Sequence, residues 1–295
     1  MPQTPDWIAV DWGTSNMRAW AMSASGSVLD KTVSDKGMGG LTPDQFESAL
    51  RTATAGWNID ALPIIACGMV GARQGWKEAP YNTVPCPATP AGFTKPDSSL
   101  DVHIIAGLMQ ANPADVMRGE ETQIAGFLSM NKNWDGVVCL PGTHTKWAHI
   151  SADEIVSFQT FMTGDLFAAI SDHTVLRHSV QSEEWDTDAF DTGVVDAMAR
   201  PERIAARLFS LRAEGLVNAM SNATARARLS GLLIGAELAG AKPYWLGQQI
   251  AVVGAGHLTS LYVRALALQS APATQVKGDA ITLAGLTAAY RRLKG

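Results

Sequence analysis

An acidic residue directly before a glycine turn is the first feature of the chain that could carry chemistry. In the segment IAVDWGTSN, Asp11 ends an apolar run. The turn after it consists of Gly13, Thr14, Ser15 and Asn16. Glycine permits a tight hairpin, backbone N–H groups and hydroxyls bind phosphate oxygens, and a carboxylate binds Mg²⁺. The pattern predicts a phosphate turn with Asp11 at a metal. An ordinary surface hairpin is the alternative, although an unpaired, desolvated carboxylate is costly.

A second glycine-threonine turn lies in the segment VVCLPGTHTKWAHI. Its residues are Gly142, Thr143, His144, Thr145 and Lys146. The order of strand, turn and strand repeats that of the first hairpin, which indicates two copies of one hairpin-led unit. We expect each copy to present its turn toward a shared central cleft. His144 and Lys146 are candidate cations for phosphate, and a solvated strand position is the alternative for Lys146.

Hydrophobic periodicity surrounds both turns with strands and helices. Strands are predicted at 8–10, 17–22, 28–33, 63–67, 102–106, 137–140, 145–150, 154–161 and 250–253. Helices are predicted from Thr42 to about 53 and at 120–131, 165–176, 194–200, 201–214, 224–239, about 257–268 and 279–293. The segment 68–100 is predicted as a long ordered loop, a type often reserved for function. The pattern indicates mixed sheets covered by helices.

Length and composition narrow the class of protein. A chain of 295 residues favours two domains, with a boundary in the NKNWD segment that separates 1–132 from 133–295. The final helix is expected to pack back on the first domain. A net charge of −5 argues against binding of nucleic acid or an anionic membrane. No membrane span or secretory signal is evident, and three cysteines without zinc spacing fit a reducing compartment, so a cytoplasmic location is expected. A homodimer is a reasonable prior for the oligomeric state.

The ordered motifs resemble those of the sugar kinase, Hsp70 and actin superfamily. The closer match rests on VDWGTSN, CGMVGARQGWKEAPY, DVMRGEETQIAGF, LPGTHTKW and TGDLF, which look like the 2-dehydro-3-deoxygalactonokinase family. The resemblance implies a two-domain actin-like ATPase (ribonuclease H-like) α/β fold with a duplicated hairpin and a central cleft. It also implies phosphorylation of 2-dehydro-3-deoxygalactonate at its terminal hydroxyl, with ATP and Mg²⁺ as cofactors.

The resemblance assigns nucleotide contacts to three turns. The two hairpin turns would hold the phosphates from opposite sides, and Gly254 and Gly256 in VVGAGH would let adenosine approach the backbone. Many superfamily members have an acid two residues before the second glycine, where this chain has Leu140. A second carboxylate ligand for the metal is therefore not expected.

Two acids compete for the role of general base. Glu120 and Glu121 lie in the first turn of the predicted 120–131 helix, where the helix dipole alone would favour acids. By resemblance to related kinases and phosphatases, Glu121 is the preferred base and Glu120 a substrate contact. Asp165 in MTGDLF is the competitor, with a substrate-hydroxyl role or a helix cap as its alternatives.

The sugar-acid substrate implied by the resemblance carries a carboxylate, for which arginine is a favoured partner. Arg73 in GARQGW is the first candidate, with Gln74 as a hydrogen-bonding group and Trp76 as an apolar wall. Arg18 could reach substrate or phosphate, and a surface ion pair is its alternative. Other substrates remain open, including 2-keto-3-deoxygluconate. The rival functions are a polyphosphate-type phosphatase and a nucleotide-dependent binding protein.

Overall fold

Two apolar runs flanking a glycine turn form the hairpin that begins the chain. Strand β1 (Trp7–Trp12) pairs antiparallel with β2 (Met17–Met22), and Asp11 lies opposite Arg18. The Gly13 N–H donates to the Asn16 carbonyl oxygen at 2.9 Å and closes the turn. The predicted hairpin therefore forms with Asp11 next to its bend.

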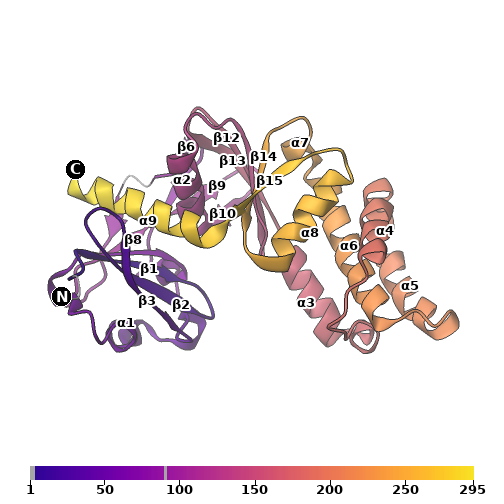
Figure 1. Ribbon diagram of the computed structural model, residues 1–295, viewed down its shortest axis with the longest axis horizontal. Coiled ribbons are helices and arrows are strands. Elements are labelled where there is room, and N and C mark those ends of the chain that lie inside the picture. Colours follow the sequence, from indigo (N-terminus) through magenta and orange to yellow (C-terminus); the bar gives the residue numbers. More distant parts are fainter. Residues whose placement is uncertain (1–3, 90–91) are drawn as a thin grey trace. The chain divides into compact units, whose positions relative to one another are not determined.

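The computed structural model describes residues 4–89 and 92–295 and divides into two compact units. Unit 1 comprises 1–135, 150–157 and 278–295, and unit 2 comprises 136–149 and 158–277. Figure 1 traces the chain through both units, from indigo to yellow. Each unit is described by itself below.

A mixed six-stranded sheet forms the centre of unit 1. Its order is β3-β2-β1-β4-β8-β7, with β3 (Val28–Ser34), β4 (Ile64–Gly68), β7 (Phe93–Thr94) and β8 (Val102–Ile105). β1, β4 and β8 run parallel to one another, so their carboxyl ends share one edge of the sheet. That edge carries Asp11 at the end of β1 and Gly68 at the end of β4.

Both faces of this sheet are buried, which explains the nearly continuous apolar runs of its strands. Ile8 and Val10 pack with Phe46 of α1 (Phe46–Ala53) on one face. Trp7 and Ala9 pack on the other face with α9 (Gly278–Lys294). Because side chains alternate along a strand, Asp11 points to the α9 face. Helix α9 also packs against α2 (Glu120–Met130), so the last helix belongs to unit 1.

A small sheet of order β10-β9-β5 completes unit 1. Its strands are β5 (Tyr81–Thr83), β9 (Gly107–Gln110) and β10 (Asp115–Met117). None of these three strands was predicted. The short strand β6 (Cys86–Pro87) pairs with Glu154 and Ile155 at the tip of the second hairpin, which is part of unit 1.

The second hairpin lies in the central sheet of unit 2. The strands follow the order β15-β14-β11-β12-β13, with β11 (Gly136–Leu140), β12 (Thr145–Ser151), β13 (Glu154–Phe161), β14 (Ile250–Gly254) and β15 (Ala273–Lys277). β15, which was not predicted, runs parallel to β14, and β14 runs parallel to β11.

Helices make up the rest of unit 2. They are α3 (Thr163–His173), α4 (Thr187–Ala199), α5 (Ile204–Val217), α6 (Asn222–Gly240), α7 (Lys242–Trp245) and α8 (Gly256–Ala267). Helix α4 begins well before the predicted 194 because the Asp186 side chain caps it by accepting from the Ala189 N–H. Met162 is the N-cap of α3 without a side-chain cap bond, so the alternative cap role of Asp165 is not observed. Among residues 4–89 and 92–295, every helix is too short or too polar to cross a bilayer.

Candidate functional site

The first of the two predicted phosphate turns is hydrogen-bonded to the loop that follows β3. The N–H groups of Met38 and Gly39 donate to the carbonyl oxygens of Gly13 (3.0 Å) and Thr14 (2.9 Å). Thr14, Ser15 and Asn16 are exposed on the other side. The turn therefore has a fixed backbone and presents hydroxyl and amide groups to solvent.

Asp11 lies in an ion-pair network within unit 1. Arg18 Nε donates to Asp11 Oδ2 at 3.1 Å, and the same guanidinium pairs with Asp279 at the start of α9. Burial lowers the pKa of Arg18, but Asp11 and Asp279 together raise it above its usual value. The ion-pair alternative for Arg18 is therefore observed, and its guanidinium is engaged with two carboxylates.

The donor groups near Asp11 fit Mg²⁺ bound through water better than a closed protein cage. The Asp11 side chain is 20% exposed, and Arg18 occupies its Oδ2 atom. Its Oδ1 atom accepts a long contact from the Cys67 thiol, with Sγ at 3.8 Å. Within the described part of the chain, no group of three or more His, Cys, Asp or Glu side chains could hold a metal. Magnesium commonly takes one or two carboxylates and completes its shell with water and substrate phosphates.

Glu121 gathers with Asp11 and Cys67 at the carboxyl edge of the unit 1 sheet, and we call these three residues the carboxylate corner. Burial is the main cause that raises the pKa of the Cys67 thiol, and the charges of Asp11 and Glu121 add to it. Gly119, with φ +107°, lets the start of α2 approach the end of β4, because a Cβ there would lie 3.3 Å from the Gly68 Cα. The backbone thus brings together acids that lie far apart in the sequence.

Within this corner, Glu121 lies in an environment that raises the pKa of its carboxyl group. Its side chain is 1% exposed and accepts hydrogen bonds from the Gly119 N–H (2.6 Å) and the Thr122 hydroxyl (3.1 Å). Burial, and then the charge of neighbouring Glu120, raise its pKa to about 8. Glu120 is half-buried and accepts from the Arg118 N–H at 3.1 Å. A carboxyl that titrates near neutral pH is suited to general base catalysis.

The predicted substrate loop divides into exposed and buried residues. Arg73 and Gln74 are exposed. Trp76 is 8% exposed and packs in the core, with ring centroids 6.0 Å from Phe46 and 6.2 Å from Trp12. Trp76 therefore anchors the loop to the core of unit 1, and its role as a substrate wall stays a prediction.

Arg118 is a notable residue of unit 1 that the sequence reasoning missed. Its Nη2 donates to the Ala79 carbonyl oxygen at 2.8 Å, and its guanidinium carbon lies 4.3 Å from the Tyr81 ring centroid. Its Nε and Nη1 atoms are buried without a hydrogen-bond partner among the described residues. Arg118 therefore braces the substrate loop from the segment that leads into α2. Its position directly before GEE was the available signal.

The second phosphate turn packs against the start of α3 in unit 2. The Asp165 N–H donates to the Thr143 carbonyl oxygen at 3.1 Å, and a Cβ on Gly164 would overlap the Gly142 carbonyl oxygen. His144 Nε2 and Asp165 Oδ2 lie 2.6 Å apart on the exposed side. Asp165, the competing base, is therefore a partner of this turn.

Two residues assigned to phosphate from the sequence have buried side chains. Thr145 is fully buried, with its hydroxyl 2.8 Å from the Tyr262 hydroxyl. Lys146 is 6% exposed and donates to Thr160 Oγ1 at 2.9 Å. Both side chains are therefore engaged in hydrogen bonds within unit 2, and their phosphate roles stay predictions.

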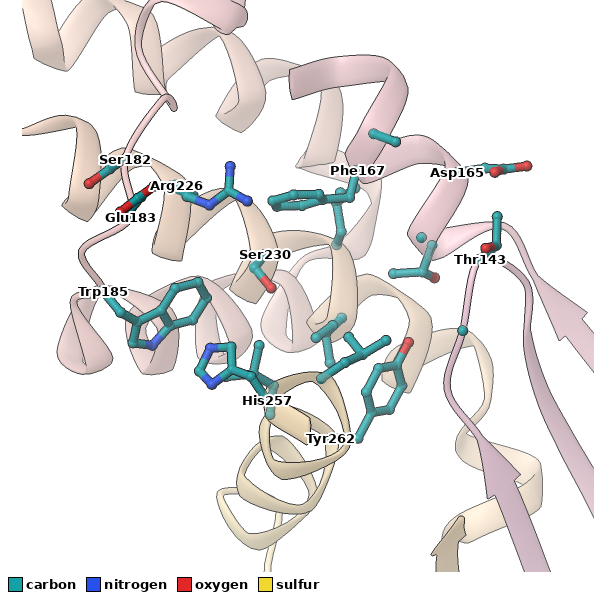
Figure 2. Close-up of a pocket in the computed structure, with 18 of the residues that line it drawn as sticks. Thr143, Asp165, Phe167, Ser182, Glu183, Trp185, Arg226, Ser230, His257 and Tyr262 are labelled. Carbon is teal, nitrogen blue, oxygen red and sulfur yellow. The ribbon is translucent and has the colours of Figure 1, made fainter. Parts of the chain in front are cut away.

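A pocket of about 750 Å³ extends from the second turn to the start of α8, and we call it the helical pocket. Figure 2 shows Thr143 and Asp165 at one end, with Trp185, Arg226 and His257 at the other. Phe167, Ser230 and Tyr262 line the space between them. The Trp185 and His257 rings meet edge to face with centroids 4.7 Å apart.

The predicted adenosine turn borders this pocket without lining it. Gly256 begins α8 with φ +70°, and the next residue, His257, faces the pocket. A Cβ on Gly254 would lie 2.6 Å from Thr259 Oγ1. Sequence reasoning missed Trp185, Arg226 and His257 because they come from separate segments without a shared motif.

Comparison with known proteins places this geometry among sugar kinases. Residues 11–289 match the model of the family described as 2-keto-3-deoxy-galactonokinase. A protein of Rhizobium meliloti (strain 1021) assigned as 2-dehydro-3-deoxygalactonokinase DgoK1 is 41% identical over 301 residues, which cover 97% of each chain. The 2-dehydro-3-deoxygalactonokinase of Escherichia coli (strain K12) is 32% identical over 286 residues, which cover 96% of this chain and 97% of that protein.

Solved structures bear on the fold. A crystal structure from Sinorhizobium meliloti, of a protein assigned as a 2-dehydro-3-deoxygalactonokinase, has a TM-score of 0.91 at 39% identity and covers 97% of this chain and 99% of its own. The ADPNP-bound activator of a 2-hydroxyisocaproyl-CoA dehydratase from Clostridium difficile has a TM-score of 0.52 at 11% identity and covers 98% and 95%. The predicted α/β, two-domain actin-like ATPase fold is confirmed.

Proposed function

The chain belongs to the 2-keto-3-deoxy-galactonokinase family, and on that premise we propose that it phosphorylates 2-dehydro-3-deoxygalactonate with ATP. The acceptor is the terminal (6-) hydroxyl of the sugar acid. The observation that carries the proposal is the family match, which spans residues 11–289 and therefore both phosphate turns. The protein is accordingly a carbohydrate kinase with a role in galactonate catabolism.

The helical pocket is proposed as the nucleoside site of unit 2. Its volume of about 750 Å³ falls in the usual range for small-molecule sites. Phe167 and Trp185 provide aromatic surface for a purine, and Arg226 provides donors. The pocket ends at Thr143, so a nucleotide bound there would direct its phosphates toward the second turn. The first turn of α3 supports this placement, because a helix N-terminus favours anions.

Mg²⁺ is proposed to bind at Asp11 of unit 1, through its Oδ1 atom and water. The ion would neutralise charge on the transferring phosphoryl group. Arg18 orients the Asp11 carboxylate, and Asp279 in turn positions Arg18. In this assignment Arg18 acts through Asp11 and does not contact substrate.

Glu121 is proposed as the general base that accepts the proton of the attacking hydroxyl. Its pKa of about 8 leaves a useful fraction ionised near neutral pH while making it a stronger base than an ordinary carboxylate. The N–H of Gly119 and the hydroxyl of Thr122 hold the carboxylate in one orientation. Asp165 is the alternative base, although its pairing with His144 supports a role in the second turn.

Arg73 is proposed to bind the substrate carboxylate, with Gln74 beside it. Both side chains are exposed on a loop that Trp76 anchors from beneath. A planar guanidinium can bind a carboxylate through two parallel hydrogen bonds. This arrangement supports selection of acids over neutral sugars.

ADP release measured with a panel of acceptors tests the proposed function. We expect rapid release with 2-dehydro-3-deoxygalactonate, slower release with 2-keto-3-deoxygluconate, and little release without an acceptor. Equal ATP turnover with and without a sugar acid would favour a nucleotide-dependent binding protein. Orthophosphate release from polyphosphate would favour the phosphatase alternative.

A cytoplasmic location is proposed as well. Cys67, Cys86 and Cys139 are free; Cys67 and Cys139 are buried, and Cys86 is half-buried. Unpaired thiols are typical of proteins in a reducing compartment. Localisation of a tagged chain by cell fractionation would test this.

A further inference from the structure

A buried acid lies beneath the second phosphate turn and has no role in the assignments above. Glu237 of α6 is 3% exposed. Its carboxylate accepts hydrogen bonds from Trp147 Nε1 (2.7 Å), from the Tyr262 hydroxyl (2.7 Å) and from the Thr163 hydroxyl. Each donor belongs to a different element, so one side chain connects α6 to β12, α8 and α3.

These elements are the ones that build the proposed nucleotide site. Thr163 is the first residue of α3, next to Gly164, which contacts the second turn. Tyr262 lines the helical pocket, and its hydroxyl also bonds to Thr145 at the end of that turn. Two of the donors around Glu237 therefore line the pocket, Thr163 beside the second turn and Tyr262 between the two ends (Figure 2).

Burial makes this arrangement costly, which argues against a merely incidental acid. Burial raises the pKa of Glu237 to about 7, and the hydrogen bonds of Thr163, Tyr262 and Trp147 oppose that rise. Apolar residues of similar volume often stabilise a core as well as or better than buried charge. A buried carboxylate that accepts several hydrogen bonds fixes the positions of its donors relative to one another, because every bond must be satisfied at the same time.

We propose that Glu237 is a positioning residue for ATP: its carboxylate sets the second phosphate turn, the start of α3 and α8 in the geometry that binds the nucleotide. The proposal rests on the proposed function, since it takes the helical pocket as the ATP site. Glu237 does not contact ATP itself and acts through Thr163, Tyr262 and Trp147. Loss of the carboxylate should therefore weaken the binding of ATP and leave the binding of the sugar acid unchanged.

The experiment compares Glu237→Gln with wild type by calorimetric titration of ATP and by steady-state kinetics. Glutamine has a similar volume, but an NH₂ group replaces one of the two acceptor oxygens. The remaining oxygen cannot accept from the Trp147 N–H and from both hydroxyls in the arrangement that the carboxylate supports. We expect Kd and KM for ATP to rise roughly 10- to 100-fold, the range for loss of a hydrogen bond to a charged group. KM for 2-dehydro-3-deoxygalactonate should change by less than about twofold.

Three further variants separate positioning from general stability. Tyr262→Phe removes one donor and should raise Kd for ATP by a smaller factor, which keeps the test available if Glu237→Gln does not fold. Trp245→Phe is the matched control for Trp147→Phe, because each deletes a buried indole hydrogen bond in unit 2. Trp245 donates to the Leu238 carbonyl oxygen, outside the Glu237 network, so this change should lower Tm without altering Kd for ATP.

Failure of the inference differs from failure of the proposed function. Unchanged ATP affinity in Glu237→Gln and Tyr262→Phe would overturn the positioning role, as would equal effects of Trp245→Phe and Trp147→Phe. A wild-type protein that binds ATP but transfers no phosphoryl group to any sugar acid would refute the proposed function alone. A wild-type protein that binds no ATP would refute both.

Discussion

The titration of Glu121 is expected to set the pH dependence of turnover in the wild-type enzyme. Its pKa is raised to about 8, first by burial and then by Glu120. A base of that pKa is ionised to about one-tenth at pH 7, one-half at pH 8 and nine-tenths at pH 9. With both substrates below saturation, kcat/KM reports the groups of the free enzyme and should therefore rise about tenfold between pH 7 and pH 9.

Two substitutions at the start of α2 identify the group that titrates. Glu121→Gln should lower kcat by about 10²- to 10⁴-fold, with little change in either KM, and should abolish the rise with pH. Glu120→Gln is the matched control, because it removes one neighbouring charge and leaves the base. In Glu120→Gln the maximal rate at high pH should be unchanged, and the pH of half-maximal rate should be lower than in the wild type. Burial of Glu121 should still keep that pH above the pKa of an ordinary glutamate.

The assay is ADP release followed by an enzyme-coupled reaction, with the coupling enzymes in excess at every pH. A flat wild-type profile between pH 7 and pH 9 would refute the reasoning. So would a Glu121→Gln variant that retains most of its turnover. If Asp165→Asn shows the loss and Glu121→Gln does not, the two assignments must be exchanged.

Three other outcomes follow from the same contacts. Asp11→Asn should lower kcat sharply with the fold intact by circular dichroism, because metal positioning contributes several kcal/mol; near-normal turnover at saturating Mg²⁺ would remove Asp11 from the site. Arg73→Ala should lower kcat/KM for the sugar acid about 10- to 100-fold and leave KM for ATP unchanged, with partial recovery in Arg73→Lys; a parallel loss for both substrates would indicate a brace for the loop. Because the folded pKa values of Glu121 and Glu237 lie above that of an exposed glutamate, their contribution to stability is complete below about pH 4.5 and is lost as pH rises to about 8. The free energy of unfolding should fall over that range by up to about 1.4 kcal/mol per pH unit for each group, so the midpoint of urea unfolding should move to lower urea concentration. This decrease should be less steep in Glu121→Gln.

Most helices and strands could be predicted from short stretches of sequence, because turn residues and the alternation of apolar and polar side chains depend on neighbouring positions. The hairpin around Gly13 and its counterpart around Gly142 form where the sequence predicts them. The strands β5, β9, β10 and β15 were missed, since they are short and one of them, β15, has mostly exposed or half-buried residues. β5 and β15 pair with strands that lie far from them in the sequence, β9 and β14, so no local window contains those pairings.

Side-chain roles were harder to predict than elements. Lys146 and Trp76 have residue types suited to ligands, and both are buried by parts of the fold that approach them from elsewhere. Arg18 meets Asp279 across 261 positions of the chain, which turns a candidate ligand into an ion-pair partner. Burial and partners, which decide what a polar side chain can do, are properties of the assembled unit.

The duplicated hairpins, the family and the positions of the candidate acids can all be predicted from the amino-acid sequence. The pKa of each acid cannot be predicted in this way, because it depends on desolvation and on charges that folding brings close. The pKa of Glu121 rises to about 8 because folding buries its carboxyl where α2 approaches the end of β4. Glu237 joins Trp147, 90 positions earlier, to Tyr262, 25 positions later, and no spacing in the chain announces that contact.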